Sequence, residues 1–177
     1  MSAPLRQLPN ALTILRFVAI PVFVVVLLAE RSGPSWVAGI VFAAAAITDQ
    51  VDGWLARRWR VESEFGKVAD PLADRLMIDV AVVMLVALDR LPWIALVILA
   101  RDLLLVVGYR FVVPRGYDFE VSRLGKIATW GLYASLALVL VTERDTWWPL
   151  ALFWIGLALA VVAAGQYLLK ARREVLR

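Results

Sequence analysis

The chain has 177 residues, of which 62% are hydrophobic, whereas a soluble domain is closer to half apolar. The excess indicates a membrane protein, and the length allows one domain over 1–177 with about six spans of roughly 20 residues each. Lys and Arg outnumber Asp and Glu by 19 to 15 and flank apolar runs, which favours lipid headgroups over nucleic acid as partner. The absence of Cys and His excludes disulfides, thiolate nucleophiles, ordinary zinc sites and imidazole acid–base chemistry.

Six apolar stretches follow one another along the chain, and we expect each to form a transmembrane helix. They span roughly 11–29, 36–59, 70–88, 91–113, 124–142 and 148–169. No clear small-residue cleavage site follows the first stretch, since Glu30 and Arg31 come next, so we interpret it as a retained helix and not a signal peptide. The predicted fold is an all-α, polytopic membrane protein with six transmembrane helices.

The basic residues fall mostly on one side of this arrangement. If the N-terminus is cytoplasmic, 14 of the 19 lie in cytoplasmic segments, and only Arg31, Arg90 and Arg144 lie in the opposite loops, each beside an acid. The tryptophans that begin segments on the opposite side, as interfacial aromatics do, are Trp36, Trp93, Trp147 and Trp148. The distribution predicts a multi-pass protein of the cell membrane with both termini in the cytoplasm.

The acidic residues between positions 49 and 74 form the strongest local pattern, DQVDGWLARRWRVESEFGKVADPLAD. At 100° per residue two sets of positions each share one helix face: Asp49, Asp52, Gly53, Ala56 and Arg57, and then Gly66, Asp70 and Asp74. The short loop between the two helices predicts that they are antiparallel neighbours. We therefore expect the four carboxylates to converge near the cytoplasmic end of the bundle.

Solvated charges beside a basic loop are an ordinary feature, and they account for Arg57–Arg60 but not for the four aspartates. A carboxylate well inside the bilayer costs roughly 2.5–3.5 kcal/mol, and aligned carboxylates also repel one another. All-oxygen ligands suit Mg²⁺, Mn²⁺ or Ca²⁺ and not zinc, and Mg²⁺ commonly joins carboxylates to phosphate oxygens. Gly53 and Gly66 would let a nucleotide approach the backbone, although close helix packing is the alternative for each glycine.

The spacing Asp-x2-Asp-Gly-x2-Ala-Arg-x8-Gly-x3-Asp-x3-Asp is complete from Asp49 to Asp74. It resembles the signature of the CDP-alcohol phosphatidyltransferase family. The stretches Leu8–Phe23 and Phe65–Met77 resemble the first and third helices of bacterial members that use glycerol 3-phosphate as acceptor. The resemblance covers most of the chain and agrees with the six expected helices.

The resemblance implies an enzyme of phospholipid biosynthesis that transfers a phosphatidyl group from CDP-diacylglycerol to an acceptor hydroxyl and releases CMP. It also implies that Asp49, Asp52, Asp70 and Asp74 hold Mg²⁺ or Mn²⁺, with Asp74 as the general base on the acceptor. The residues that it implies for the cytidine diphosphate pocket are Gly53, Ala56, Arg57, Gly66, Asn10 and Thr13. Dimerisation is common in the family, so a homodimer is a further implication.

The expected acceptor is glycerol 3-phosphate, but the later helices depart from the members that use it. Those members usually carry an Arg-Glu pair and a Gly-Lys-x-Lys-Thr stretch, where this chain has Arg101-Asp102 and only one Lys in 125–129. An Arg-Asp pair is more like the cardiolipin synthases of this family, whose acceptor is phosphatidylglycerol. Both acceptors carry phosphate, and the candidate residues for it are Arg101, Arg110, Arg123 and Lys126. The alternatives are an ion pair with Asp102 for Arg101 and orientation signals for Arg110 and Arg123.

Asp79 lies about 140° round its helix from Asp74 and so off the expected metal face. We expect it to form a salt bridge with Arg101 or Arg16. A cation transporter is the remaining alternative for the acidic cluster, since intramembrane carboxylates often mark ion paths. Such a path favours acids near mid-bilayer on several spans, whereas these acids gather on two adjacent spans near one face.

Overall fold

The computed structural model describes residues 3–30, 33–59, 64–112 and 123–175. Side chains are not described for 3–13, 16, 49–59, 64–74, 107–112, 168 and 170–175. The described ranges contain six α-helices, one 3₁₀ helix and no strand, so the all-α prediction is confirmed. The elements are α1 (Ala3–Ala29), α2 (Trp36–Trp59), α3 (Glu64–Ala87), η1 (Trp93–Leu96), α4 (Val97–Val112), α5 (Arg123–Val141) and α6 (Trp147–Val175).

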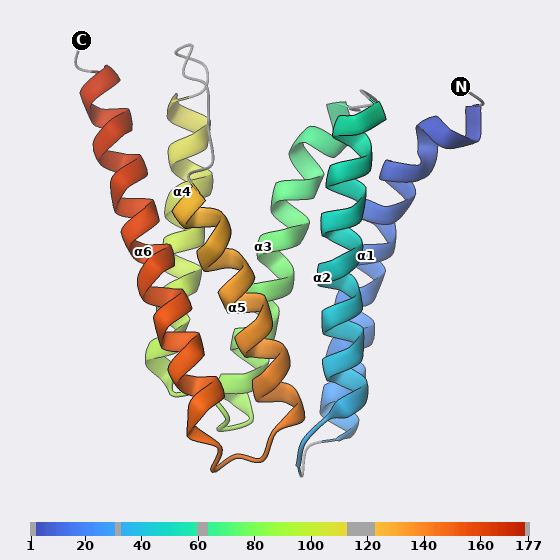
Figure 1. Ribbon diagram of the computed structural model, residues 1–177, viewed down its shortest axis with the longest axis vertical. Helices are drawn as coiled ribbons and strands as arrows, with labels where there is room; N and C mark the ends of the chain where they lie inside the picture. Colours follow the sequence, from blue (N-terminus) through green and yellow to red (C-terminus); the bar gives the residue numbers. More distant parts are fainter. Residues whose placement is uncertain (1–2, 31–32, 60–63, 113–122, 176–177) are drawn as a thin grey trace.

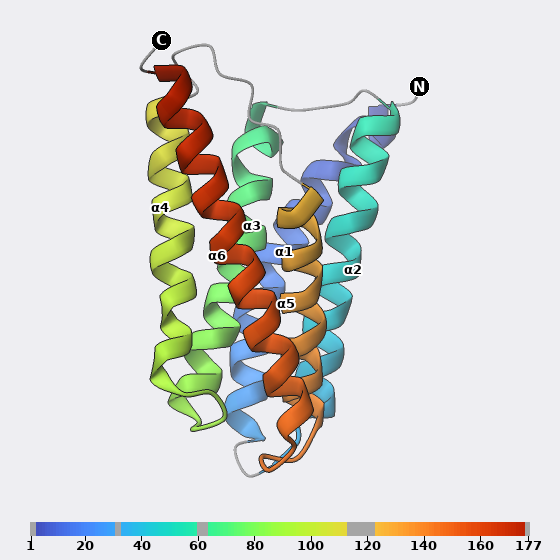
Figure 2. The same ribbon diagram turned by 60° about the vertical axis from the view of Figure 1, so that its left-hand side comes forward.

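The helices run up and down along the long axis of the molecule (Figure 1). The start of α1 and the end of α6 lie at the same end as the end of α2 and the start of α3, which we call the N/C end (Figures 1 and 2). Helix α1 packs against α2 and α3, α5 packs against α2 and α6, and α4 packs mainly against α6. Helix α3 lies between the α1–α2 pair and the α4–α6 pair (Figure 1).

The core is apolar and the outward faces of the helices are apolar as well. Inside, the Phe42 ring lies 5.7 Å from the Phe23 ring and 5.5 Å from the Tyr133 ring between centroids, so these aromatics join α1, α2 and α5. Outside, Val25 and Leu103 are 67% and 65% exposed. Apolar side chains on both the inner and the outer faces of the described helices fit a membrane protein.

Within the described residues, two helices, Arg123–Val141 and Trp147–Tyr167, are long and apolar enough to cross a membrane. Shorter apolar helical stretches cover Phe17–Ala29 and Trp36–Thr48. The tryptophans expected at an interface are all exposed, and they lie at the end opposite the N/C end, at the starts of α2, η1 and α6: Trp36, Trp93, Trp147 and Trp148.

Helices α5 and α6 pack closely against each other. A Cβ atom added at Gly156 would lie 3.2 Å from the backbone nitrogen of Leu132 and 3.4 Å from the carbonyl carbon of Gly131. Small residues at a helix crossing let two backbones approach, which is how helices pack tightly in lipid. Gly156 therefore sets the separation of α5 and α6.

At the end opposite the N/C end, Arg90 ties three loops together. Its Nη1 donates to the carbonyl oxygens of Gly33 at 3.1 Å and Leu140 at 3.3 Å, and its Nη2 donates to the carbonyl oxygen of Thr142. Burial lowers the pKa of Arg90 from its ordinary value, the charge of Arg144 lowers it further, and Glu143 opposes both. Each bonded carbonyl belongs to a segment near the end of α5 or the start of α2, where backbone groups lack helical partners.

The helices extend beyond the apolar stretches that predicted them. Helix α3 begins at Glu64 and not near residue 70, α1 begins at Ala3, and α6 continues to Val175. An apolar run predicts only the part of a helix that is suited to lipid, while the helical backbone continues into polar sequence. The stretch expected at 91–113 divides into η1 and α4 after Pro92, which has no backbone N–H and takes an extended conformation with φ −70° and ψ 152°.

Candidate active site

The four motif aspartates lie on two antiparallel helices that meet the N/C end at the same level (Figure 1). At 1.5 Å per residue, Asp49 and Asp52 lie about 15 and about 10 Å before the end of α2 at Trp59. Asp70 and Asp74 lie about 9 and about 15 Å after the start of α3 at Glu64. The backbone thus places two aspartate positions of α2 at the same two depths as two aspartate positions of α3.

The side chains of most predicted site residues lie outside the described part of the chain. Their helices are described, with Asn10 and Thr13 on α1 and Arg110 on α4. The motif residues whose side chains are not described are Asp49, Asp52, Gly53, Ala56, Arg57, Gly66, Asp70 and Asp74. Convergence of the four carboxylates therefore stays a prediction that the backbone depths support.

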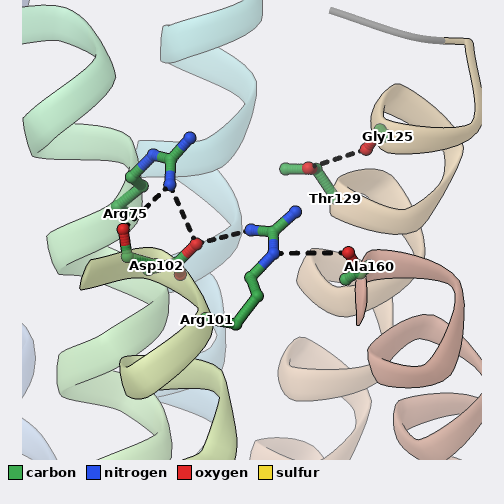
Figure 3. A network of polar contacts seen from close by, with 6 residues as sticks. All are labelled: Arg75, Arg101, Asp102, Gly125, Thr129 and Ala160. Carbon is green, nitrogen blue, oxygen red and sulfur yellow. Dashed lines mark hydrogen bonds and ion pairs between the residues drawn. The ribbon is translucent and has the colours of Figure 1, made fainter. Parts of the chain in front are cut away.

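Directly after Asp74, the side chain of Arg75 begins a buried ionic cluster (Figure 3). Arg75 Nη1 lies 3.1 Å from Asp102 Oδ1 and also donates to the Asp102 carbonyl oxygen at 3.3 Å. Arg101 Nη1 lies 2.5 Å from the same Asp102 Oδ1. One carboxylate oxygen of α4 therefore serves a guanidinium of α3 and a guanidinium of its own helix.

The cluster continues to α6 and back to α3. Arg101 Nε donates to the carbonyl oxygen of Ala160 at 3.4 Å, which joins α4 to α6 (Figure 3). Asp79, four residues after Arg75 on α3, lies next to the Asp102 carboxyl group. Its Oδ1 is buried and receives no hydrogen bond within the part of the chain that the structure describes.

Arg101 pairs with Asp102, its sequence neighbour, so the ion pair proposed as the alternative for this arginine is confirmed. The prediction that Asp79 forms a salt bridge with Arg101 is not borne out among the described residues, where the ion pairs of this cluster both go to Asp102. Position 16 lies outside the described side chains, so an ion pair there stays untested. The Asp102 carboxylate lies between the two guanidiniums. Asp79 contacts the Asp102 carboxyl group instead of a guanidinium.

Two other candidates for the acceptor phosphate lie at the start of α5. Arg123 and Lys126 are both exposed, and they are three residues apart, so they share one face of the helix. The first turn of a helix also presents free backbone N–H groups and a partial positive charge. Further along, Thr129 Oγ1 donates to the Gly125 carbonyl oxygen at 2.9 Å, so its hydroxyl is used within the helix (Figure 3).

Comparisons with known proteins assign the chain to a family. The family model for CDP-alcohol phosphatidyltransferase matches residues 6–162. The chain belongs to the CDP-alcohol phosphatidyltransferase family. It is therefore an enzyme, and the matched range includes α2, α3 and the whole aspartate motif.

Three curated relatives extend the match over nearly the whole chain, and all three are called CDP-diacylglycerol–glycerol-3-phosphate 3-phosphatidyltransferase. The protein of Bacillus subtilis is 34% identical over 183 residues, which cover 93% of this chain and 94% of that protein. The proteins of Salmonella typhimurium and Escherichia coli K12 are 32% and 31% identical over 179 residues, covering 96% of this chain and 97% of each protein.

The donor set of this phosphatidyltransferase fits a hard divalent cation. All four motif positions are aspartates, and their oxygens are the ligands that Mg²⁺ and Mn²⁺ take. The matching depths on α2 and α3 allow ligands from both helices to reach one site. The chain has neither Cys nor His, so softer metals have no ordinary ligand here.

Sequence reasoning missed the role of Arg75, which it counted only as a cytoplasmic basic residue. Arg75 and Asp102 are 27 positions apart, and no periodicity relates residues of two different helices. A signal was available in Asp102, an acid in an apolar stretch, because a buried carboxylate usually has more than one charged or hydrogen-bonding partner.

Proposed function

We propose that this phosphatidyltransferase moves the phosphatidyl group of CDP-diacylglycerol to glycerol 3-phosphate, giving phosphatidylglycerophosphate and CMP. The complete eight-residue motif on α2 and α3 carries the proposal, since it provides the acidic cluster that chemistry at a diphosphate requires. The three relatives, which bear the name of this reaction and match more than nine-tenths of the chain, support the choice of substrates.

In the proposed mechanism, the acceptor hydroxyl oxygen forms a bond to the lipid-linked phosphorus, and the bond from that phosphorus to the CMP oxygen breaks. Asp74 accepts the proton of the acceptor hydroxyl. Asp49, Asp52, Asp70 and Asp74 hold Mg²⁺ or Mn²⁺. When bound, such a cation neutralises the charge that develops on the diphosphate as CMP leaves.

The remaining motif residues bind the donor. Gly53 and Gly66 leave room for the cytidine diphosphate against α2 and α3, and Arg57 pairs with its phosphates. Ala56 completes that face of α2, and Asn10 and Thr13 approach from α1, which packs against both helices. A donor whose headgroup lies at the interface and whose acyl chains lie in lipid suits a site about 9 to 15 Å from the helix ends.

For the acceptor phosphate we favour Arg123 and Lys126, with Arg110 as a further candidate. Arg123 and Lys126 are exposed on one face at the positive end of α5, where a phosphate is stabilised both by the side chains and by the helix dipole. Arg101 remains a candidate, but its guanidinium already bonds Asp102 and the Ala160 carbonyl oxygen.

The proposed topology has six spans, with both termini and the active site in the cytoplasm. The 14-to-3 distribution of basic residues supports this orientation, and the start of α1 and the end of α6 lie together at the N/C end (Figure 1). A homodimer in the membrane is also proposed, on the resemblance to the family alone.

The second candidate function is cardiolipin synthesis with phosphatidylglycerol as acceptor, and the Arg101-Asp102 pair favours it. Purified enzyme is given CDP-diacylglycerol with either glycerol 3-phosphate or phosphatidylglycerol, and the lipid products are separated. We expect phosphatidylglycerophosphate with the first acceptor and no cardiolipin with the second. Turnover with phosphatidylglycerol alone would establish the second function in place of the first.

A further inference from the structure

Asp102 is a buried acid that the proposed chemistry does not use. Its side chain is 4% exposed, and it belongs to α4 and not to either of the two helices that carry the aspartate motif. A buried carboxylate is costly unless several partners compensate it, and here two guanidiniums do so through one oxygen. The arrangement links α4 to α3 and α6 (Figure 3), and Arg75 lies at the middle of α3.

The face of α3 that turns toward α4 is fixed at two points. Arg75 bonds both the carboxylate and the backbone carbonyl of Asp102, and Asp79 lies next to the same carboxyl group. Residues four apart share one side of a helix, so Arg75 and Asp79 define a single contact line along α3. The contacts of Arg75 and Asp79 with Asp102 therefore set the rotation of α3 about its own axis.

That rotation bears on the aspartate motif, because a helix turns as one body. Asp74 precedes Arg75 directly, and Asp70 precedes it by five residues. At 100° per residue, these two positions lie about 100° and about 140° round α3 from Arg75, on the same side. Any change in the Arg75–Asp102 link therefore moves both aspartate positions in the same sense relative to α2.

We propose that Asp102 is a positioning residue for the transfer: through Arg75 it sets the rotation of α3, and so the placement of Asp70 and Asp74 around the divalent cation. The proposal rests on the proposed function, which makes these two aspartates metal ligands. Outer partners of metal ligands commonly alter metal affinity when they are replaced, even though they never touch the metal.

The test is Mn²⁺ binding, measured on the purified full-length enzyme in detergent from the loss of the free Mn²⁺ electron paramagnetic resonance signal. Asp102→Asn keeps the size of the side chain and removes its charge, and we expect the Kd for Mn²⁺ to rise about tenfold. Asp102→Glu restores the carboxylate, and its Kd should stay within about threefold of wild type. Unchanged Mn²⁺ affinity in folded Asp102→Asn would overturn the proposal.

Two further variants separate positioning from stability. Arg90→Gln removes a buried cation at the opposite end of the bundle, and it should lower the melting temperature without changing the Kd for Mn²⁺. An equal loss of affinity in Arg90→Gln would show a merely structural effect and contradict the proposal. If Asp102→Asn does not fold, Arg75→Lys tests the same link, because it keeps the charge and loses the planar guanidinium fork. Its Kd should rise, and an unchanged Kd would refute the link.

Asp70→Asn distinguishes failure of this inference from failure of the proposed function. If wild type binds Mn²⁺ and Asp70→Asn does not, the metal role of the motif stands, and the Asp102 variants then decide the inference alone. If Asp70→Asn binds Mn²⁺ like wild type, the ligand assignment itself is wrong, and the inference that depends on it fails with it.

Discussion

The arginines of this bundle have two different roles. Near the middle, Arg75 and Arg101 share the Asp102 carboxylate, so their charges are compensated by an acid. At the far end, Arg90 bonds three backbone carbonyl oxygens instead. The first arrangement joins helices beside the proposed active site, whereas the second closes loops, so the two should be separable by mutation.

Arg90→Gln tests the loop role. The substitution leaves the carbonyl oxygens of Gly33, Leu140 and Thr142 without their charged donor. A single hydrogen bond to a charged group contributes about 1.5–3 kcal/mol to stability. We expect a lower melting temperature in detergent, followed by tryptophan fluorescence. Arg144→Gln is the matched control, since exposed Arg144 makes one described hydrogen bond, to Leu88, and it should have a much smaller effect. Equal melting temperatures for wild type and Arg90→Gln would contradict the role.

At the scale of elements, the contact of α5 with α6 depends on the absence of a side chain. A Cβ atom at position 156 would lie only 3.2 Å from the backbone nitrogen of Leu132. The larger side chain of Gly156→Leu therefore forces the two helices apart. We expect a clear loss of thermal stability. Gly165→Leu on the same helix is the control, because no heavy atom lies within 4 Å of its added Cβ. Similar stability of the two variants would show that this crossing does not need glycine.

The sequence predicted the all-α class and the six α-helices of the described residues, but not how one helix contacts another. Periodicity within 49–74 was enough to place four aspartates on two faces, because it depends only on residues of the same helix. The Arg75–Asp102 pair depends on how α3 packs against α4, and that packing involves side chains far apart in the chain. Pro92 is an intermediate case: it marks a break, but only the structure shows that a turn of 3₁₀ helix follows.

For the whole molecule, the absence of cysteine allows the proposed topology to be measured directly. Single cysteines are introduced at Asp145, in the loop between α5 and α6, and at Arg172, near the end of α6. In intact cells an impermeant maleimide should label position 145, and it should label position 172 only after the membrane is opened. The reverse pattern would contradict cytoplasmic termini, and labelling of both positions in intact cells would rule out an odd number of crossings between them.

The bundle as a whole carries the aspartate motif near its N/C end, beyond an apolar body, and the central claim is that this motif performs the transfer there. The most direct test is CMP release from CDP-diacylglycerol in the presence of glycerol 3-phosphate, with wild type and Asp70→Asn compared at matched folded protein. We predict that wild-type release stops when divalent cations are chelated and returns with Mg²⁺ or Mn²⁺, and that Asp70→Asn loses at least about a hundredfold in rate. Release of CMP by Asp70→Asn at the wild-type rate would contradict the account.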